Sequence, residues 1–349
     1  MVDIKSLNIE ELTEYVMGMG FPKFRAGQLY QWMHSKLVTG FDKMTNIPKD
    51  MKEKLTRECE YVALKAVKVQ TSAIDGTSKY LFELGDKNLI ESVLMKYKHG
   101  NSVCISSQVG CRMGCRFCAS TLDGCVRNLT PSEMLDQIYR IQDLTGERVD
   151  NVVVMGSGEP MDNYESLIKF MELLNAKDGL NISARNLTVS TCGLVPKIYE
   201  LADMQPQITL AISLHAPNDE LRRTLMPIAN KYSVEELIKA CRYYVGKTNR
   251  RITFEYSLVQ GVNDSVAQAE ELAGLVKGLN CHINLIPVNP IKERDFRQTR
   301  QEEIQKFKNR LEKNSINVTI RREMGRDIDG ACGQLRKSYS DSHVIQEET

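Results

Sequence analysis

Residues 102–118 read SVCISSQVGCRMGCRFC, a short apolar run followed by three closely spaced cysteines. The run SVCIS has the composition of a buried strand. Cys111, Cys115 and Cys118 follow it with the spacing Cys-x3-Cys-x2-Cys, and Cys104 precedes them by seven residues. Zinc knuckles, disulfide-linked modules and iron–sulfur clusters all use closely spaced cysteines. This stretch therefore bears on the fold and on the chemistry at once.

Short β-rich runs recur after this one, and a segment with helical periodicity follows each of them. The runs are NVVVM at 151–155, LTVST at 187–191, ITLAIS at 208–213, ITFEYSL at 252–258 and HINLI at 282–286. The helix after the cysteines has a defined start, with Thr130 as N-cap, Pro131 at the first position and Glu133 completing a capping box. Strand–helix alternation predicts parallel βαβ units, and six units predict an α/β fold with a partial (β/α)6 TIM-like barrel.

The sequence predicts four regions. Residues 1–60 have helical periodicity and form a small N-terminal accessory domain. Residues 61–100 form a short β-rich linker or extension, in which strands flank the turn AIDGTS. Residues 101–340 form the barrel, which ends in a glycine-rich, mobile loop around Cys332. Residues 341–349 form a frayed tail.

The accessory domain allows two interpretations. Its basic side chains make it a candidate RNA-binding unit: Lys23, Arg25 and Lys36. Alternatively, its aromatic residues do no more than form its core: Phe24, Tyr30 and Trp32.

The composition, with 42% hydrophobic and 26% charged residues, is that of an ordinary globular protein. The first residues lack the features of a secretion signal, and no apolar run reaches the roughly 18 residues that a membrane helix needs. We therefore expect a cytoplasmic protein, monomeric by default, with no membrane partner. In a reducing cytosol, clustered cysteines are more often metal ligands or catalysts than structural disulfides.

The net charge of +1 does not by itself indicate a nucleic-acid binder, but basic clusters occur along the chain. The clusters are Arg222-Arg223, Arg250-Arg251, Arg321-Arg322 with Arg326, and Arg336-Lys337. Alone, such clusters are more often a solvated face, and they become candidate phosphate contacts only if they surround a site.

Polar residues follow the predicted strands at the points where the strands end. They are Gly156–Pro160 (GSGEP), Ser190 with Thr191, Ser213–His215, and Asn289 within PVNP. Because the carboxyl ends of parallel strands meet at one face of a barrel, we expect these residues and the cysteines to form a single site.

Three thiolates leave a tetrahedral zinc site one ligand short, and His99 or His215 could supply the fourth. A [4Fe-4S] cluster is normally held by four cysteines. Three would leave one iron with an open position for a substrate or cofactor, which suits chemistry at the iron better than plain electron transfer.

The cysteine spacing, with Phe117 before the last cysteine, is similar to the signature of radical S-adenosylmethionine (SAM) enzymes, and GSGEP resembles the second-strand motif of that superfamily. Together with SLHAPNDELRRTLMPI, GVND, NLIPVNP and DIDGACGQL, these runs resemble the RNA adenine C2-methyltransferases of the superfamily over roughly residues 1–340. That family methylates an adenine in the peptidyl-transferase centre of 23S rRNA and, in bacteria, an adenine beside the tRNA anticodon. One departure is Ser157, where the family more often has methionine, and we expect little consequence from it.

The resemblance implies a [4Fe-4S] cluster on Cys111, Cys115 and Cys118, and two molecules of SAM per turnover. It implies that Cys332 accepts a methyl group, that a radical formed from a second SAM activates this S-methyl group, and that the activated carbon adds to C2. Cys104 would then take the C2 proton and attack the sulfur of Cys332, which releases the RNA and leaves a disulfide that must be reduced. Glu91 is an alternative proton acceptor, or else a solvent-facing carboxylate of a strand.

The resemblance also implies a cofactor pocket at the strand ends. Gly158 and Glu159 would meet the methionyl end of SAM. The ribose and carboxylate region would be met by Ser190, Ser213, Leu214 and His215. Asn289 would meet the adenosine. The implied partners are RNA, namely 23S rRNA and tRNA, and an electron donor such as flavodoxin or ferredoxin. The basic clusters would contact the phosphates of the RNA.

Two rival functions stay open. A related subfamily methylates C8 of the same ribosomal adenine with the same five cysteines, but its second-strand motif more often reads GEA, so Glu159-Pro160 favours C2. A zinc-stabilised RNA-binding module without catalysis would explain three cysteines, but it would not explain the strand-end residues or the pair Cys104 and Cys332. A brown protein would favour the cluster, and a colourless one would favour zinc.

Overall fold

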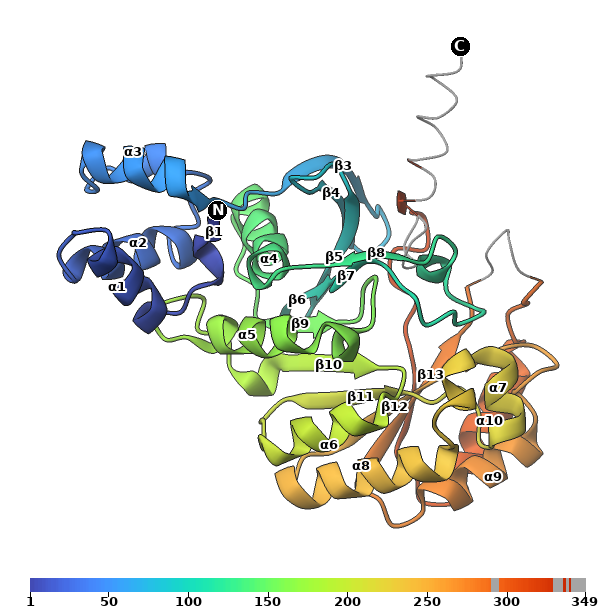
Figure 1. Cartoon of the computed structure of the whole chain (residues 1–349). Coiled ribbons are helices and arrows are strands. Elements are labelled where there is room, and N and C mark those ends of the chain that lie inside the picture. The colour runs from blue at the N-terminus through green and yellow to red at the C-terminus, as the bar shows by residue number, and fades with distance from the viewer. Residues whose placement is uncertain (290–294, 329–334, 337–338, 340–349) are drawn as a thin grey trace.

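A computed structural model describes residues 1–289, 295–328, 335–336 and 339 of the chain. Figure 1 shows one large sheet with helices packed along it and a smaller helical domain at one side. No described helix is both long and apolar enough to cross a membrane.

The sheet of the described residues has ten strands in the order β14-β13-β12-β11-β10-β9-β6-β5-β4-β3. Its parallel part contains the six predicted runs: β6 (Gly100–Ile105), β9 (Asn151–Val154), β10 (Leu187–Thr191), β11 (Thr209–Ser213), β12 (Ile252–Leu258) and β13 (Cys281–Pro287). A short strand, β14 (Val318–Ile320), adds to the outer edge in parallel with β13. The predicted α/β fold with a partial barrel is therefore confirmed.

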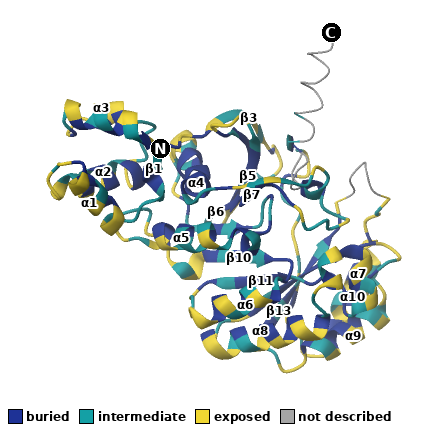
Figure 2. Ribbon diagram, viewed as in Figure 1, coloured by how far each residue is buried: buried dark blue, intermediate teal, exposed yellow. Residues whose placement is uncertain are grey.

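Helices connect the parallel strands and cover the outer face of the sheet, where their apolar sides meet buried strand residues (Figure 2). They are α4 (Pro131–Thr145), α5 (Tyr164–Asn175), α6 (Val195–Asp203), α8 (Val234–Thr248), α9 (Val266–Val276) and α10 (Gln301–Lys313). The short helix α7 (Asp219–Leu225) packs elsewhere, because its buried Leu225 lies with Cys192 and Met226 in a separate apolar cluster. The capping box predicted for α4 is present: Thr130 accepts the N–H of Glu133, and the Glu133 carboxylate accepts the N–H of Thr130. This cap satisfies main-chain donors that the first turn of a helix leaves open.

The β-rich segment after residue 61 forms three strands: β3 (Lys65–Thr71), β4 (Ser78–Glu83) and β5 (Leu89–Tyr97). They pair antiparallel with one another, and β5 pairs antiparallel with β6, so that Val93 lies opposite Cys104. The segment is thus more than a linker, because it continues the sheet of the barrel. We call β3–β5 the antiparallel extension.

The N-terminal domain contains α1 (Ile9–Gly18), α2 (Phe24–His34) and α3 (Lys49–Glu58), and β1 (Val2–Asp3) pairs with β2 (Cys59–Glu60). Its three aromatic candidates differ in exposure. Tyr30 is buried, Trp32 is half-buried with the ammonium of Lys36 3.7 Å above its ring, and Phe24 is 59% exposed. Of the three, Tyr30 alone is a true core residue.

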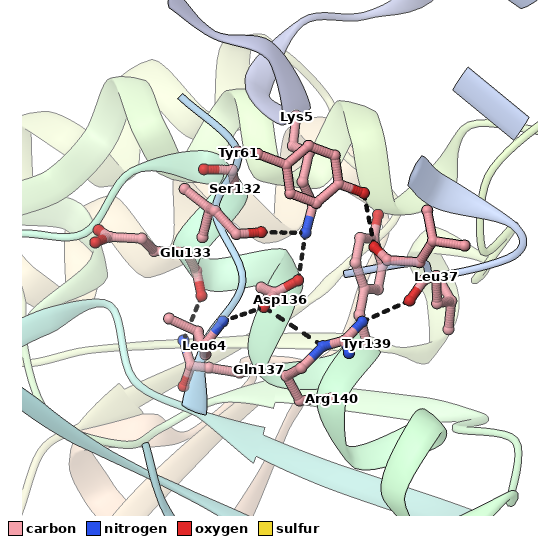
Figure 3. A network of polar contacts seen from close by, with 12 residues as sticks. Lys5, Leu37, Tyr61, Leu64, Ser132, Glu133, Asp136, Gln137, Tyr139 and Arg140 are labelled. Atoms are coloured by element: carbon pink, nitrogen blue, oxygen red, sulfur yellow. Dashed lines mark hydrogen bonds and ion pairs between the residues drawn. The ribbon is translucent and has the colours of Figure 1, made fainter. Parts of the chain in front are cut away.

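A buried ion pair fixes this domain against α4 (Figure 3). The ammonium of Lys5 binds the carboxylate of Asp136 and donates to the carbonyl of Val62 at 2.7 Å, and both charged side chains are fully buried. The second carboxylate oxygen of Asp136 accepts the N–H of Leu64 at 2.7 Å, and Arg140 donates to the carbonyl of Leu37 at 2.6 Å. Burial lowers the pKa of Lys5, and Asp136 opposes that shift. One carboxylate on α4 therefore holds two separate segments of the chain.

We expect Asp136→Asn to destabilise the protein by about 3–5 kcal/mol, because it leaves the Lys5 ammonium buried without a counter-charge. The measurement is the free energy of unfolding from urea denaturation. Glu53→Gln is the control, because it removes the same charge from an exposed pair with Lys49, and it should leave the unfolding midpoint unchanged. Equal midpoints for the two variants would show that the buried pair does not hold the domains together.

Candidate active site

A cavity of about 570 Å³ opens at the carboxyl ends of the parallel strands. Its walls include the three clustered cysteines and Cys104, together with residues from the ends of β9–β13. Of the residues predicted to bind a cofactor, those that line it are Gly158, Glu159, Ser190, Ser213, His215 and Asn289. Leu214 does not line it, because its side chain is fully buried in the core. The structure thus brings six of these seven residues together around one cavity.

The cysteine loop is held by a small hairpin, β7 (Gln108–Gly110) with β8 (Cys125–Asn128). The N–H of Cys111 donates to the carbonyl of Gly124 at 2.7 Å, and Gly110 has a φ of +76°. A Cβ at Gly110 would lie 2.0 Å from that carbonyl oxygen, so only glycine fits this turn. The Thr121 hydroxyl donates to the carbonyls of Cys115 and Cys118, which curls the loop over the cavity.

The three thiols fit a multi-iron cluster better than a single ion. No group of three or more His, Cys, Asp or Glu side chains in the described residues is close enough to hold one metal ion. In a [4Fe-4S] cluster each cysteine binds a different iron, so the sulfurs need not converge on one point. Burial raises the pKa of Cys111 to about 12 and raises that of Cys115 further, so binding iron must release protons from these thiols.

The carboxylate of Glu159 joins the ends of two neighbouring strands. One oxygen accepts the N–H of Met161 at 3.0 Å, and the other accepts the N–H of Cys192 at 2.7 Å, just beyond β10. Burial raises the pKa of Glu159, while these N–H donors stabilise its charged form. Gly158 has a φ of +108° and packs closely against Gln108. A Cβ on Gly158 would lie 2.7 Å from the main-chain nitrogen of Gln108.

Ser157, which stands where the family more often has methionine, contacts a neighbouring serine. Ser157 is buried, and its hydroxyl lies 3.0 Å from the hydroxyl of Ser120, directly after the cysteine loop. Its carbonyl accepts the N–H groups of Ser107 and Gln108. Ser157 thus connects the loop after β9 to the segments that follow β6 and the cysteine loop. The glycines on either side of it, Gly156 and Gly158, are the same as in the family motif.

His215 is held in one orientation at the end of β11. Its Nδ1 accepts the N–H of Ser257 at 2.9 Å, and its carbonyl accepts the side-chain amide of Asn263 at 2.7 Å. Burial, assisted by Arg222, lowers its pKa to about 3. The ring is therefore neutral with its proton on Nε2, and the ring of Phe117 lies against it edge-on at 4.6 Å between centroids.

Glu91 is not the solvent-facing carboxylate that one interpretation expected. It is 4% exposed, and it pairs with the fully buried Lys79 at 3.2 Å. Its other oxygen accepts the main-chain N–H of Arg336 at 2.6 Å. Glu91 therefore binds the chain four residues after Cys332, which itself lies outside the described residues.

A second set of contacts holds the chain before Cys332, and we call it the clasp. The carboxylate of Asp327 accepts the Ser72 hydroxyl at 2.5 Å and the Ala73 N–H at 2.8 Å, and Asp75 accepts the N–H of Gly325 at 3.0 Å. Although burial opposes it, hydrogen bonding from the N–H groups of Gly325 and Thr77 lowers the pKa of Asp75 to about 2. The turn between β3 and β4 is thus bound to the segment that follows β14.

The basic clusters do not all surround the cavity. Arg321, Arg322 and Arg326 line it. Arg250 and Arg251 precede β12, at the opposite end of the sheet, so their predicted role as contacts at the mouth is wrong. The prediction is also wrong for Arg222, which is fully buried. Arg336 binds Asp123 at 3.0 Å, Arg223 is exposed, and Lys337 lies outside the described residues.

Sequence reasoning missed part of the cavity wall. Thr77, Val93 and Met95 come from the antiparallel extension, and Glu255 and Ser257 come from β12. Burial raises the pKa of Glu255, and the side-chain amide of Asn284 donates to it at 2.9 Å. A carboxylate inside the apolar run ITFEYSL was the available signal, since charged residues are rarely buried without a partner.

Two parts of the chain match known family models. Residues 105–273 match the model described as the radical SAM superfamily. Residues 2–61 match the model described as the ribosomal RNA large subunit methyltransferase N-terminal domain.

Curated relatives match over nearly the whole chain. A protein of Lachnospira eligens is 72% identical over 339 residues, which cover 97% of each chain. A protein of Lachnoclostridium phytofermentans is 60% identical over 346 residues, which cover 99% of this chain and 97% of that one. Both are named "Probable dual-specificity RNA methyltransferase RlmN". The crystal structure of a radical SAM methyltransferase from Sphaerobacter thermophilus superimposes with a TM-score of 0.92 at 44% identity, over 96% of this chain and 99% of that one.

We expect Gly158→Ala to destabilise the protein by about 2 kcal/mol or more, because the new Cβ meets Gln108 and Ser107 at 2.7 Å in a left-handed backbone conformation. Thermal and urea unfolding measure the change. Gly246→Ala is the control, since Gly246 lies within α8 with open space around it, and alanine there should stabilise the helix slightly. Unchanged stability of Gly158→Ala would mean that the second-strand loop tolerates a side chain at this position.

Proposed function

This chain belongs to the RlmN family of dual-specificity RNA methyltransferases in the radical SAM superfamily, and we propose that it methylates C2 of an adenine in 23S rRNA and in tRNA. The observation that supports this function best is that Cys104 lines the same cavity as Cys111, Cys115 and Cys118. An additional thiol beside a cluster site suits a reaction that needs a second cysteine.

Cys111, Cys115 and Cys118 would hold a [4Fe-4S] cluster, and the strand-end residues would hold SAM. When bound, the cluster and SAM would supply one-electron chemistry able to remove hydrogen from an unactivated carbon. We assign the methionyl group of SAM to Gly158 and Glu159, and Ser190, Ser213 and His215 supply polar atoms along the rest of the cavity.

The chain itself must carry the methyl group, because C2 of adenine is too poor a nucleophile to displace it from a sulfonium. We assign that task to Cys332, whose thiolate would accept the methyl group and form the bond to the RNA after activation. We assign to Cys104 the removal of the C2 proton and the attack on the sulfur of Cys332. Once the C2 proton and the unpaired electron of the adduct have left, the attack breaks the bond between the Cys332 sulfur and the methylene carbon, which takes up a proton to become the methyl group of the RNA. A Cys104–Cys332 disulfide is left, which an external thiol must reduce.

Glu91 is better suited to hold the chain after Cys332 than to act as a free base. Its two oxygens are bound to Lys79 and to the N–H of Arg336, so the carboxylate would have to give up a contact before it could accept a proton. We therefore assign Glu91 a positioning role and leave the C2 proton to Cys104.

The substrate would have to present its adenine unstacked, because Cys104 lines a cavity and enzymes that act on base atoms take the base out of the stack. Arg321, Arg322 and Arg326 line this cavity and supply positive charge for RNA phosphates. An electron donor of the flavodoxin or ferredoxin class would reduce the cluster. We propose that the enzyme acts as a monomer in the cytoplasm.

We expect Cys104→Ala protein, produced anaerobically with its cluster, to be trapped as a covalent adduct with RNA, because resolution needs the second thiol. Gel electrophoresis of the complex detects the adduct, and mass spectrometry of the Cys332 peptide from unmutated protein should show a methyl group. Cys125→Ala is the control, since Cys125 lies beside the cysteine loop without lining the cavity, and it should not trap RNA. An unmodified Cys332 with no adduct, despite an intact cluster, would reject this mechanism, and an 8-methyl product would reassign the target carbon.

We expect Glu91→Gln to keep most of the Cys332 methylation and Glu91→Ala to lose it at least tenfold, because glutamine retains an oxygen for the Arg336 N–H. The occupancy of S-methylcysteine at Cys332 is the readout. A proton acceptor would behave differently, since Glu91→Gln would then be as inactive as Glu91→Ala while Cys332 stayed methylated in both.

A further inference from the structure

Arg222 is a fully buried arginine behind the wall of the cavity. It lies on α7, and its guanidinium reaches the carboxyl ends of β10 and β11. Nη2 donates to the carbonyls of Cys192 at 2.6 Å and Ser213 at 3.3 Å, and Nε donates to the carbonyl of Leu214 at 3.2 Å. One side chain thus fastens two neighbouring strand ends that form the predicted cofactor pocket.

The charge of Arg222 has no carboxylate partner among the residues that the structure describes. None of their ion pairs includes it, and its Nη1 has no hydrogen-bond partner within them. Burial lowers the pKa of Arg222. A buried cation without a counter-charge is strongly unfavourable, and the cysteine loop that packs on the same helix is where a bound cluster would supply negative charge.

The helix that carries Arg222 is attached to the cysteine loop. The N–H of Arg116 donates to the carbonyl of Leu225 at 2.9 Å, and a Cβ on Gly114 would lie 3.3 Å from Pro227. Leu225 and Met226 are buried together with Cys192, and the apolar side chains that pack on them include Met113, Cys115 and Phe117. Arg222 and the loop therefore belong to one packed unit.

We propose that Arg222 is a positioning residue whose buried charge compensates the negative charge of the cluster site, and that it holds the cysteine loop and the ends of β10 and β11 in register for SAM. This inference rests on the proposed function, because it assumes that an iron–sulfur cluster occupies the three cysteines. Three thiolates exceed the two positive charges of an oxidised [4Fe-4S] cluster by one, and the electron taken up on reduction adds another negative charge. A fixed cation nearby stabilises the reduced state more than the oxidised state.

The test is an anaerobic redox titration of cluster-loaded protein without SAM, with dithionite as the one-electron donor and the reduced cluster followed by electron paramagnetic resonance. We expect Arg222→Gln to lower the reduced-to-oxidised ratio about tenfold at a fixed potential, which corresponds to a midpoint about 59 mV more negative for a one-electron couple. Arg222→Lys keeps the charge and should stay closer to the unmutated midpoint. Arg223→Gln removes the same charge from the adjacent, solvent-exposed position, and should leave the midpoint unchanged.

A second measurement covers the case in which Arg222→Gln loads no cluster. Hydrogen exchange on cluster-free protein should show faster exchange of the Arg116 amide in Arg222→Gln than in Arg223→Gln, because the first variant loosens α7 from the strand ends. Equal midpoints for Arg222→Gln and Arg223→Gln, or equal Arg116 exchange where no midpoint is obtained, would overturn the proposal. Product analysis on the same unmutated sample tests the methyltransferase function separately: a loaded cluster without RNA methylation rejects that function and still allows the midpoints to be compared.

Discussion

The hydrogen bonds of Glu159 to the N–H groups of Met161 and Cys192 are the contacts on which the site depends most. Parallel strands bring their carboxyl ends to one edge, but nothing in the strands themselves fixes the loops that follow. In this protein a buried side chain joins each loop to a neighbour. The amide of Asn263 donates to the carbonyls of both His215 and Ser257, and that of Asn163 donates to the carbonyls of Ser107 and Leu129. Contacts within the protein therefore shape the mouth of the barrel, which reduces the ordering that cofactor binding would otherwise require.

Buried polar side chains also connect the N-terminal domain to the barrel. Asp136 lies on α4, the helix that follows the cysteine loop, and its carboxylate holds Lys5 and Leu64 from outside the barrel. Its neighbour Gln137 accepts the N–H of Ser106 and donates to its carbonyl, directly after β6. Two consecutive residues of one helix thus set the position of the accessory domain and the exit of the first barrel strand. The accessory domain and the barrel are therefore held in one orientation.

Local signals made much of this structure predictable from the sequence. The six strand runs, the capping box of Thr130 and Glu133, and the cysteine spacing depend on residues close in sequence, so pattern and propensity reveal them. The burial of Arg222 could not be foreseen in the same way, because an Arg-Arg pair on a short helix has the pattern of a solvated face, and its environment is formed by strands elsewhere in the chain. Lys5 and Asp136 are 131 residues apart and give no local sign of pairing. The antiparallel extension was predicted as strands, but its place in the barrel sheet depends on pairing between β5 and β6 that alternation alone does not encode.

The clasp between the β3–β4 turn and the segment after β14 joins the two outer edges of the ten-stranded sheet. A partial barrel is an open ribbon, and an open ribbon can widen by uncurling about its long axis. Because Asp75 and Asp327 bind across the gap, uncurling would require breaking three hydrogen bonds in addition to bending the sheet. The clasp therefore limits how far the open barrel can widen at this gap, beside the cavity that Thr77 and Gly325 help to line.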